Sequence, residues 1–151
     1  MFKVAQASTV GDLDTARNIM ERIREENPQH WPHGLAAEAY DGGLYLVREK
    51  RSNAPAGFAG WQERNERVQG KTVRTGYYSI GILPEYRRQG YAKQALTKLI
   101  AEKSAGVDRV MAYIVSSNAP SLELAKSLDV PVRLKQAGFL KTACCVGRDL
   151  I

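Results

Sequence analysis

Apolar residues recur at two different spacings along this chain of 151 residues, and the spacings predict its strands and helices. Alternation and short apolar runs predict six strands, over residues 2–5, 44–47, 56–61, 73–83, 107–115 and 141–148. Helical spacing predicts four helices, which run from Thr9 to Asn27, over about 35–40, from Gly90 to Gly106, and from Asn118 to Pro131. One or two further helical turns are expected over 132–137. The predicted order is strand, two helices, three strands, helix, strand, helix and strand.

Local signals support the boundaries of these helices. Thr9 precedes the first helix and Asp12 follows three residues later, which is typical of a capped helix start. Pro120 stands near the first turn of the last helix, where its missing N–H costs no hydrogen bond. The helix after Gly90 has the clearest pattern of all. Its apolar face consists of Ala92, Ala95, Leu96, Leu99 and Ile100.

This order of elements predicts an α+β fold, in which a mixed sheet carries helices on both of its faces. A length of 151 residues is ordinary for one domain with a single sizeable core. The sequence contains no internal repeat, low-complexity tract or linker. We therefore expect one domain that spans residues 1–151.

The net charge of +6 permits several kinds of anionic partner without choosing among them. Acidic residues interrupt the basic ones, as in the segment 48–51, and neither a helix-turn-helix nor a basic and aromatic surface pattern is present. No apolar run approaches the roughly 20 residues that span a bilayer, and the N-terminus lacks the apolar core of a signal peptide. We expect a cytoplasmic protein that binds neither nucleic acid nor membrane.

The residues that most often bind metals do not form a metal site in this sequence. Cys144 and Cys145 are neighbours, and they fit a role as small packed hydrophobes better than a disulfide framework or a zinc site. His30 and His33 are three residues apart, but a proline separates them and no third ligand is evident. We expect no metal.

The segment ILPEYRRQGYAKQAL, residues 82–96, has the features of a phosphate site. A predicted strand leads there almost directly into a predicted helix, whose first N–H groups have no intrahelical partner and whose dipole is positive at this end. Gly90 and Ala92 leave room for an anion to approach the backbone. Additional donors or positive charges come from Arg87, Arg88, Gln89 and Lys93.

Residues 87–92 resemble the R/Q-x-x-G-x-G/A signature of the GNAT superfamily of N-acetyltransferases, at the place in the order of elements where that family has it. Asn118 and Ser121 follow the next strand as in the family, and Gly138-Phe139 resembles its Gly-Phe pair before the last strand. The order of elements matches over nearly the whole chain. The resemblance implies the GNAT fold, with a mostly antiparallel sheet of about six to seven strands.

The resemblance also implies a reaction, in which an acetyl group moves directly from acetyl-CoA to a primary amine of a small molecule or protein. Backbone amides of residues 88–93 would hold the pyrophosphate, and the end of the preceding strand would pair with the pantetheine arm. The cofactor-binding residues implied in this way are Ile80, Gly81, Ile82, Arg87, Arg88, Gln89, Gly90, Tyr91, Ala92, Lys93, Asn118 and Ser121.

The family's catalytic side chains are only partly present. Many members carry a glutamate base where this chain has Gly76, and a tyrosine acid where it has Leu134. The substitutes that the sequence offers are Tyr78, Tyr113 and Ser117. A backbone N–H near residue 82 would stabilise the oxyanion that develops during the transfer.

The loop over residues 29–34 lies where the family often builds its acceptor pocket. His30, Trp31 and His33 are therefore the predicted acceptor-binding residues, and His33 or Glu38 could serve as a remote base through water. Family members also often form homodimers through their last strands, which makes a homodimer possible here.

Two other functions remain open at this point. A GNAT-fold protein could bind an acyl-CoA, or nothing, and act as a structural or interaction module. The absence of Glu at Gly76 and of Tyr at Leu134 supports this alternative, whereas the intact phosphate segment opposes it. A nucleic-acid binder is favoured by the net charge alone. The enzyme is the preferred interpretation.

Overall fold

The described part of the protein is built on one seven-stranded sheet with the strand order β1-β2-β3-β4-β5-β7-β6. The computed structural model describes residues 2–31, 37–40, 42–115, 117–128, 132–137 and 140–145. The strands are β1 (Phe2–Gln6), β2 (Leu44–Glu49), β3 (Pro55–Val68), β4 (Lys71–Ile82), β5 (Arg109–Val115), β6 (Val132–Ala137) and β7 (Leu140–Cys145). The α-helices are α1 (Val10–Glu26), α2 (Tyr91–Lys103) and α3 (Ala119–Ser127). Short 3-10 helices are η1 (Pro28–His30), η2 (Ala37–Tyr40), η3 (Pro84–Tyr86) and η4 (Ser104–Gly106).

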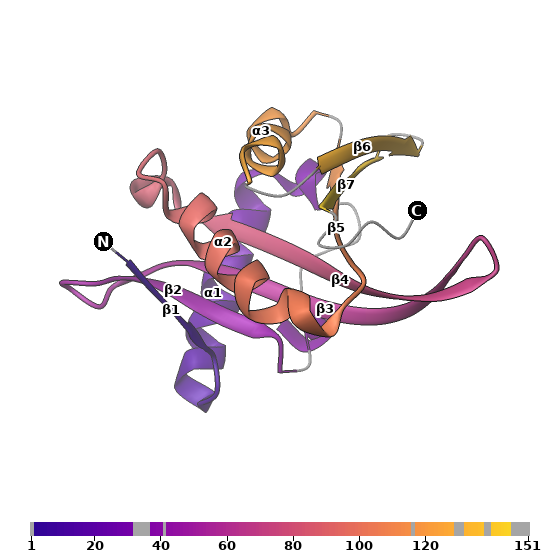
Figure 1. Cartoon of the computed structure of the whole chain (residues 1–151). Helices are drawn as coiled ribbons and strands as arrows, with labels where there is room; N and C mark the ends of the chain where they lie inside the picture. The colour runs from indigo at the N-terminus through magenta and orange to yellow at the C-terminus, as the bar shows by residue number, and fades with distance from the viewer. Residues whose placement is uncertain are drawn as a thin grey trace.

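Strand directions make the sheet mixed. β4 and β5 run parallel, whereas every other pair of neighbours in the sheet is antiparallel. The helices α1 and α2 lie on opposite faces of the sheet, α1 behind it and α2 in front of it in Figure 1. These observations confirm the predicted α+β fold with a mixed sheet and helices on both faces.

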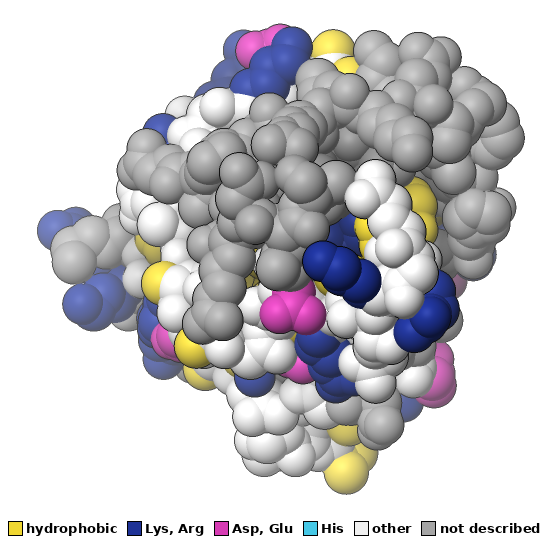
Figure 2. All heavy atoms as spheres, turned by 45° about the vertical axis from the view of Figure 1, so that its right-hand side comes forward, with side chains coloured by type: hydrophobic (Ala, Val, Ile, Leu, Met, Phe, Trp, Pro, Cys, Tyr) yellow, Lys and Arg dark blue, Asp and Glu magenta, His cyan; other side chains and the backbone are white. Residues whose placement is uncertain are grey.

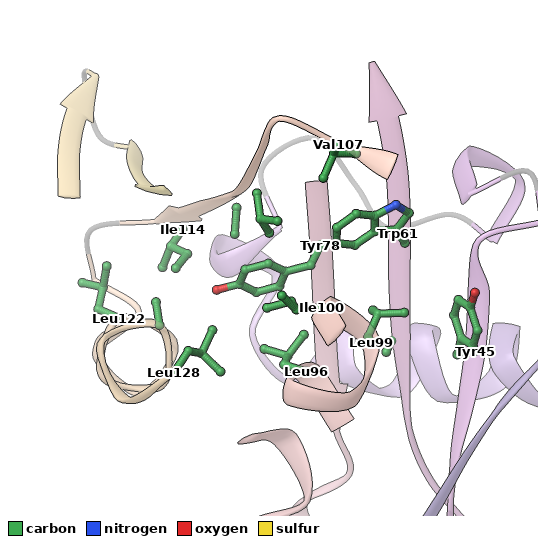
Figure 3. Packing of buried hydrophobic residues seen from close by; sticks show 14 residues of the cluster. Tyr45, Trp61, Tyr78, Leu96, Leu99, Ile100, Val107, Ile114, Leu122 and Leu128 are labelled. Carbon is green, nitrogen blue, oxygen red and sulfur yellow. The ribbon is translucent and has the colours of Figure 1, made fainter. Parts of the chain in front are cut away.

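Alternation along β4 gives each face of the sheet its own core. Gly81 lies against Ile23 of α1, so the odd-numbered residues of β4 point to the face that α1 covers, here called the α1 face. Tyr78 packs in a cluster with Leu96 of α2, so the even-numbered residues point to the opposite α2 face (Figure 3). The core on the α1 face is centred on Phe58, which is fully buried.

The predicted start of α1 is confirmed in detail. Thr9 has an extended backbone, and its hydroxyl oxygen accepts a hydrogen bond of 3.0 Å from the backbone N–H of Asp12. Helix α3 begins in the same way, because the side-chain oxygen of Asn118 accepts from the backbone N–H of Ser121. Each side chain thereby satisfies one N–H group that the helix itself leaves unpaired.

The prediction of helical turns over residues 132–137 is wrong, because this segment is strand β6. It pairs with β7 in a continuous antiparallel register from Val132↔Cys145 to Ala137↔Leu140. The sequence from Val132 to Lys135 does alternate apolar and basic residues, but six residues are too few for this alternation to stand out. Pairing with β7, the next strand in the sequence, decides the conformation.

Two further segments differ from the prediction in extent. β3 and β4 form a long hairpin that continues past the expected strand end at Trp61 and projects beyond the neighbouring strands (Figure 1). Its outer part carries mostly charged residues on both faces, so it shows no apolar alternation. The short helix expected at about 35–40 is the 3-10 helix η2 over Ala37–Tyr40.

The cap at Thr9 gives a test of how α1 is held. We expect Thr9→Ala to lower the free energy of unfolding by about 1 kcal/mol, because the N–H of Asp12 loses its partner. Thr9→Ser keeps the oxygen and should stay close to the wild type. Urea unfolding of the three proteins measures the difference, and equal loss in both variants would show that the hydroxyl does not cap the helix.

Candidate functional site

The central feature of the candidate site is an early end to the pairing of β4 and β5. Their parallel register covers only three residue pairs, of which Tyr77↔Met111 is the last. Beyond it, β4 continues to Ile82 along β3, and β5 continues to Val115 along β7. The two strands therefore part in the middle of the sheet, and the edges that face each other across the gap lack a neighbouring strand.

The edge of β4 presents backbone hydrogen-bonding groups to this gap. The N–H of Leu83 donates to the carbonyl of Ala56 in β3, whereas the carbonyl of Arg74 accepts from the N–H of Asp108, just before β5. Neighbouring residues of a strand direct their backbone groups to opposite sides, and the register with β3 is unbroken from Lys71 to Ile82. Ile80 and Ile82 therefore direct their N–H and C=O groups into the gap. The carbonyl of Ile82 is already bonded to Arg87 Nε at 2.8 Å.

A positively charged turn follows the end of β4. Arg88 and Gly90 both have left-handed backbone conformations, with φ of 62° and 79°. Successive N–H groups in such a turn converge on one point and form an anion-binding concavity. Gly90 is also the N-cap of α2, without a side-chain hydrogen bond, and the first turn of the helix contains no acidic residue. The first N–H groups of α2 are thus open to a ligand.

A cavity of about 530 Å³ connects the turn with the gap. It is lined by the predicted cofactor-binding residues except Gln89, and also by His30 and Trp31. Residues that the sequence did not single out complete the wall. They are Ile23, Glu26 and Asn27 at the end of α1, Tyr86 in η3, and Pro120 and Leu124 in α3.

The charged side chains of the turn have different surroundings. Arg87 donates through Nη1 to Glu26 of α1 at 2.6 Å as well as to the Ile82 carbonyl, so its side chain ties the turn to α1 and to β4. Arg88 and Lys93 form no ion pair with any residue that the structure describes. Their charges therefore remain available at the mouth of the cavity.

The three candidate catalytic side chains are not brought together. Tyr78 is buried on the α2 face, where its ring lies among Ile100, Leu96 and Ile114 (Figure 3). Tyr113 is 54% exposed, and it points to the α1 face because its neighbours on β5 pack on the α2 face. Ser117 is exposed beside Asn118. The sheet thus separates the two tyrosines.

Gly76 has no room for the side chain that the resemblance would place there. A Cβ atom at this position would lie 2.1 Å from Cζ2 of Trp61, which is itself buried and donates from Nε1 to Glu63. Position 76 faces the hydrophobic cluster on the α2 face. The indole ring of Trp61 therefore occupies the space that a glutamate side chain at position 76 would need. Leu134 belongs to β6, where the backbone pairs with Ala143.

The predicted acceptor loop is described only in part. His30 and Trp31 line the cavity, and the Trp31 ring lies 6.2 Å from that of Phe58. His33 lies outside the described residues. Glu38 is ion-paired with Arg17 of α1 at 3.1 Å, and hydrogen bonds from the backbone and from Arg17 lower the pKa of its carboxyl group.

A polar network that the sequence did not reveal crosses β3, β4 and β5 on the α1 face. Its members, which we call the Glu66 network, are Glu66, Thr75, Tyr77, Arg109 and Tyr113. Tyr77 Oη donates to Glu66 Oε2 at 2.6 Å and lies 3.2 Å from Tyr113 Oη. Arg109 donates to Thr75 Oγ1 at 2.8 Å and to Glu66 Oε1 at 3.1 Å. The two tyrosine rings are stacked, with centroids 5.1 Å apart.

The network shifts the pKa of two of its groups. Burial, together with hydrogen bonding to Glu66 and Tyr113, raises the pKa of Tyr77 above its ordinary value of 10.0. Burial acts to raise the pKa of Glu66, but hydrogen bonds from Tyr77, Thr75 and Arg109 outweigh it and hold that pKa below its ordinary value. At neutral pH the network therefore contains the carboxylate of Glu66 and the neutral phenol of Tyr77.

Basic side chains on the face shown in Figure 2 are interspersed with acidic and uncharged ones. Among the described residues no helix is both long and apolar enough to cross a membrane, and no group of three or more His, Cys, Asp or Glu residues is placed to hold a metal ion.

Comparisons with known proteins agree with this geometry. A family model described as "Acetyltransferase (GNAT) family" matches residues 14–129. No protein with a curated description matches the sequence significantly. Two solved structures with the same fold are the ribosomal-protein-S5-alanine acetyltransferase of Vibrio fischeri (15% identity, TM-score 0.70, 99% of this chain and 95% of that chain) and the ribosomal-protein-alanine N-acetyltransferase of Brucella melitensis (20%, 0.63, 94% and 96%).

A third similar structure is a chain of the NatC complex bound to Gag peptide and CoA, at 12% identity and a TM-score of 0.70, with 95% of each chain covered. At identities this low, the structural similarity shows a shared fold and nothing more specific.

The contact between Gly76 and Trp61 can be tested by a double-mutant cycle. Gly76→Ala should lower the free energy of unfolding by about 1–3 kcal/mol, because its Cβ overlaps the indole. In a Trp61→Leu background the same substitution should cost less, since the smaller side chain leaves space. Urea unfolding of the four proteins gives the coupling. Strictly additive costs would mean that the indole does not exclude a side chain at position 76.

The raised pKa of Tyr77 predicts an alkaline loss of stability. Below pH 10 the phenol is neutral in both the folded and the unfolded state. Above pH 10 the unfolded state releases this proton while the folded state retains it, so the free energy of unfolding should fall as the pH rises. Tyr77→Phe should show a shallower fall between pH 9 and 11 in urea titrations. Equal slopes in the two proteins would contradict the shift.

Proposed function

Because the chain belongs to the GNAT family of acetyltransferases, we propose that it moves the acetyl group of acetyl-CoA directly to a primary amine of a small molecule or protein. The observation that carries the proposal is the cavity that joins the turn at Gly90 to the gap between β4 and β5. A site of this shape suits a long ligand with a phosphate group at one end and an extended, amide-containing arm.

The turn supplies the phosphate end of the proposed site. N–H groups of residues 88–93 would bond the pyrophosphate of coenzyme A, and the charges of Arg88 and Lys93 would neutralise it. Arg87 would contribute its backbone, since its side chain is bonded to Glu26 and to the Ile82 carbonyl. An anion-binding turn argues against the alternative of a purely structural module, because such a module has no chemical need for a phosphate site.

The gap supplies the place for the pantetheine arm. Amides of that arm would pair with the N–H and C=O groups of Ile80 and with the N–H of Ile82, as an added strand would. The side chains of Asn118 and Ser121 would contact the arm from the start of α3. Bound CoA in the structurally similar NatC complex is consistent with this assignment.

The reaction then needs an approach for the acceptor. The thioester would enter the gap from the side of α2 and α3, and the amine would reach it from the α1 face, beside His30 and Trp31. Solvent would first take one proton from the ammonium form of the acceptor, which leaves a neutral amine. The amine nitrogen then forms a bond to the thioester carbonyl carbon, and a backbone N–H that points into the gap would stabilise the intermediate oxyanion. The C–S bond breaks, and the thiolate of coenzyme A takes the second proton that the nitrogen releases.

The alternative of an acyl-CoA-binding or interaction module rests on the crowded site at Gly76, where the family's glutamate is replaced and cannot be accommodated. The identity of the acceptor separates the two functions. Two structural neighbours are named for the alanine of ribosomal proteins, so a peptide with an N-terminal alanine is a suitable first probe, with free lysine as a small-molecule probe. A cytoplasmic location and a homodimer stay predictions.

Binding is tested by thermal unfolding with increasing acetyl-CoA. At 100 times its dissociation constant the ligand should add about 2.7 kcal/mol to the free energy of unfolding. Gly90→Glu places a negative charge at the turn and should abolish the shift. The matched control is Gly70→Glu, because Gly70 has the same φ of 79° in the β3–β4 turn but no neighbour within 4 Å. A Gly90→Glu variant that responds like the control would refute the phosphate site.

Transfer is tested in parallel by the release of coenzyme A thiol with the two probes. Turnover in the wild type, with acetylated product found by mass spectrometry, supports the enzyme. A wild type that is stabilised by acetyl-CoA yet acetylates neither probe would favour the binding module.

A further inference from the structure

The hydrogen bonds between the side chains of Tyr113, Tyr77 and Glu66 all run in one direction. Glu66 is ionised at neutral pH, so its carboxylate only accepts hydrogen bonds. Tyr77 must therefore donate its single hydroxyl hydrogen to Glu66 Oε2, which lies 2.6 Å away. In the 3.2 Å contact between the two phenols, Tyr77 can then only accept and Tyr113 must donate. The one hydrogen of Tyr113 is thus directed inward.

This direction is held firmly by the buried end of the network. Thr75 is fully buried, and the side chain of Arg109 is 12% exposed while it bonds both Thr75 and Glu66. The stacked rings of Tyr77 and Tyr113 are 11° from parallel, and the guanidinium of Arg64 lies 5.1 Å from the Tyr77 ring centroid. A fixed carboxylate at one end and stacked rings along the way leave the outer phenol little freedom to turn.

The outer end of the network lies at the gap. Tyr77 belongs to the last residue pair that joins β4 to β5, and Tyr113 lies two residues beyond Met111 on the diverging part of β5. Tyr113 is exposed on the α1 face, which is the face from which the acceptor would approach. Its oxygen keeps a lone pair there and no hydrogen to give.

We propose that the hydroxyl oxygen of Tyr113 accepts a hydrogen bond from an N–H of the acceptor amine and thereby orients the amine toward the thioester. Tyr77 and Glu66 are positioning residues, which act through Tyr113 by fixing the direction of its hydrogen. The inference rests on the proposed function, and it assigns Tyr113 to the acceptor. A primary amine suits this site, because it keeps N–H groups for Tyr113 while its lone pair attacks.

Steady-state kinetics with acetyl-CoA and whichever of the two probes, the alanine peptide or lysine, is acetylated test the proposal. Tyr113→Phe should lower kcat/KM for the amine by about 10-fold, equivalent to about 1.4 kcal/mol, which is within the range of a hydrogen bond between two neutral groups. The KM for acetyl-CoA should stay unchanged. Tyr45→Phe is the matched control, since it removes a phenol oxygen from β2, away from the gap, and should retain full activity.

The positioning residues need a readout that a purely structural role would not move. Tyr77→Phe and Glu66→Gln should each lower kcat/KM for the amine by less than Tyr113→Phe does. Because Tyr77 acts only through Tyr113, the double variant Tyr77→Phe/Tyr113→Phe should be no slower than Tyr113→Phe alone. Tyr113 is largely exposed, so its replacement by Phe should leave the thermal midpoint and the acetyl-CoA-induced shift close to those of the wild type.

The outcomes separate this inference from the function on which it rests. A wild type that acetylates neither probe overturns both. An active wild type whose Tyr113→Phe variant has the same kcat/KM for the amine overturns the inference and leaves the acetyltransferase intact. Additive losses in the double variant would show that Tyr77 does not act through Tyr113. Non-additive losses confined to the amine support the proposal.

Discussion

The early end of the β4–β5 pairing is the constraint on which the rest of the site depends. A parallel pair that continued past Tyr77↔Met111 would use the backbone groups of Ile80 and Ile82 within the sheet and leave no opening. β4 stays extended because β3 pairs with it along its whole length, and β5 is supported in the same way by β7. The opening therefore removes only the hydrogen bonds that β4 and β5 would have made with each other. The backbone groups on these two facing edges are available to a ligand.

The two faces of the sheet differ beside the place where β4 and β5 separate. On the α2 face, Tyr78 and Trp61 fill the space beside β4 with aromatic rings, and Gly76 is required because the indole occupies the place of its side chain. On the α1 face, the Glu66 network replaces apolar packing with fixed hydrogen bonds and reaches the surface at Tyr113. The Glu66 network thus places groups that could meet a polar acceptor on the face opposite to the apolar packing around Tyr78.

The sequence predicts the features that local rules determine. The cap at Thr9, the apolar face of α2 and the turn at Gly90 are each encoded within a few residues, and the structure confirms the cap and the turn geometry. The sequence does not indicate β6, because its alternation covers few residues and its conformation depends on pairing with β7. The outer β3–β4 hairpin is not indicated either, because its residues are mostly charged on both faces. The Glu66 network joins residues up to 47 positions apart on three strands, from Glu66 to Tyr113, and no local pattern marks it. The crowding of Gly76 by Trp61 is equally non-local.

The charge balance of the Glu66 network decides which role it can have in acetyl transfer. Three donors and the charge of Arg109 hold the pKa of Glu66 below its ordinary value, so this carboxylate is a weak base and a poor final acceptor for an ammonium proton. The raised pKa of Tyr77 likewise keeps its phenol neutral, so this phenol does not readily pass a proton from one member of the Glu66 network to the next. Because the pKa of Glu66 is lowered and that of Tyr77 is raised, the network orients hydrogen bonds and does not take up or release protons at neutral pH. Its contribution to a reaction is therefore geometric, which makes the direction of the Tyr113 hydroxyl, rather than its acidity, the property that an acceptor would sense.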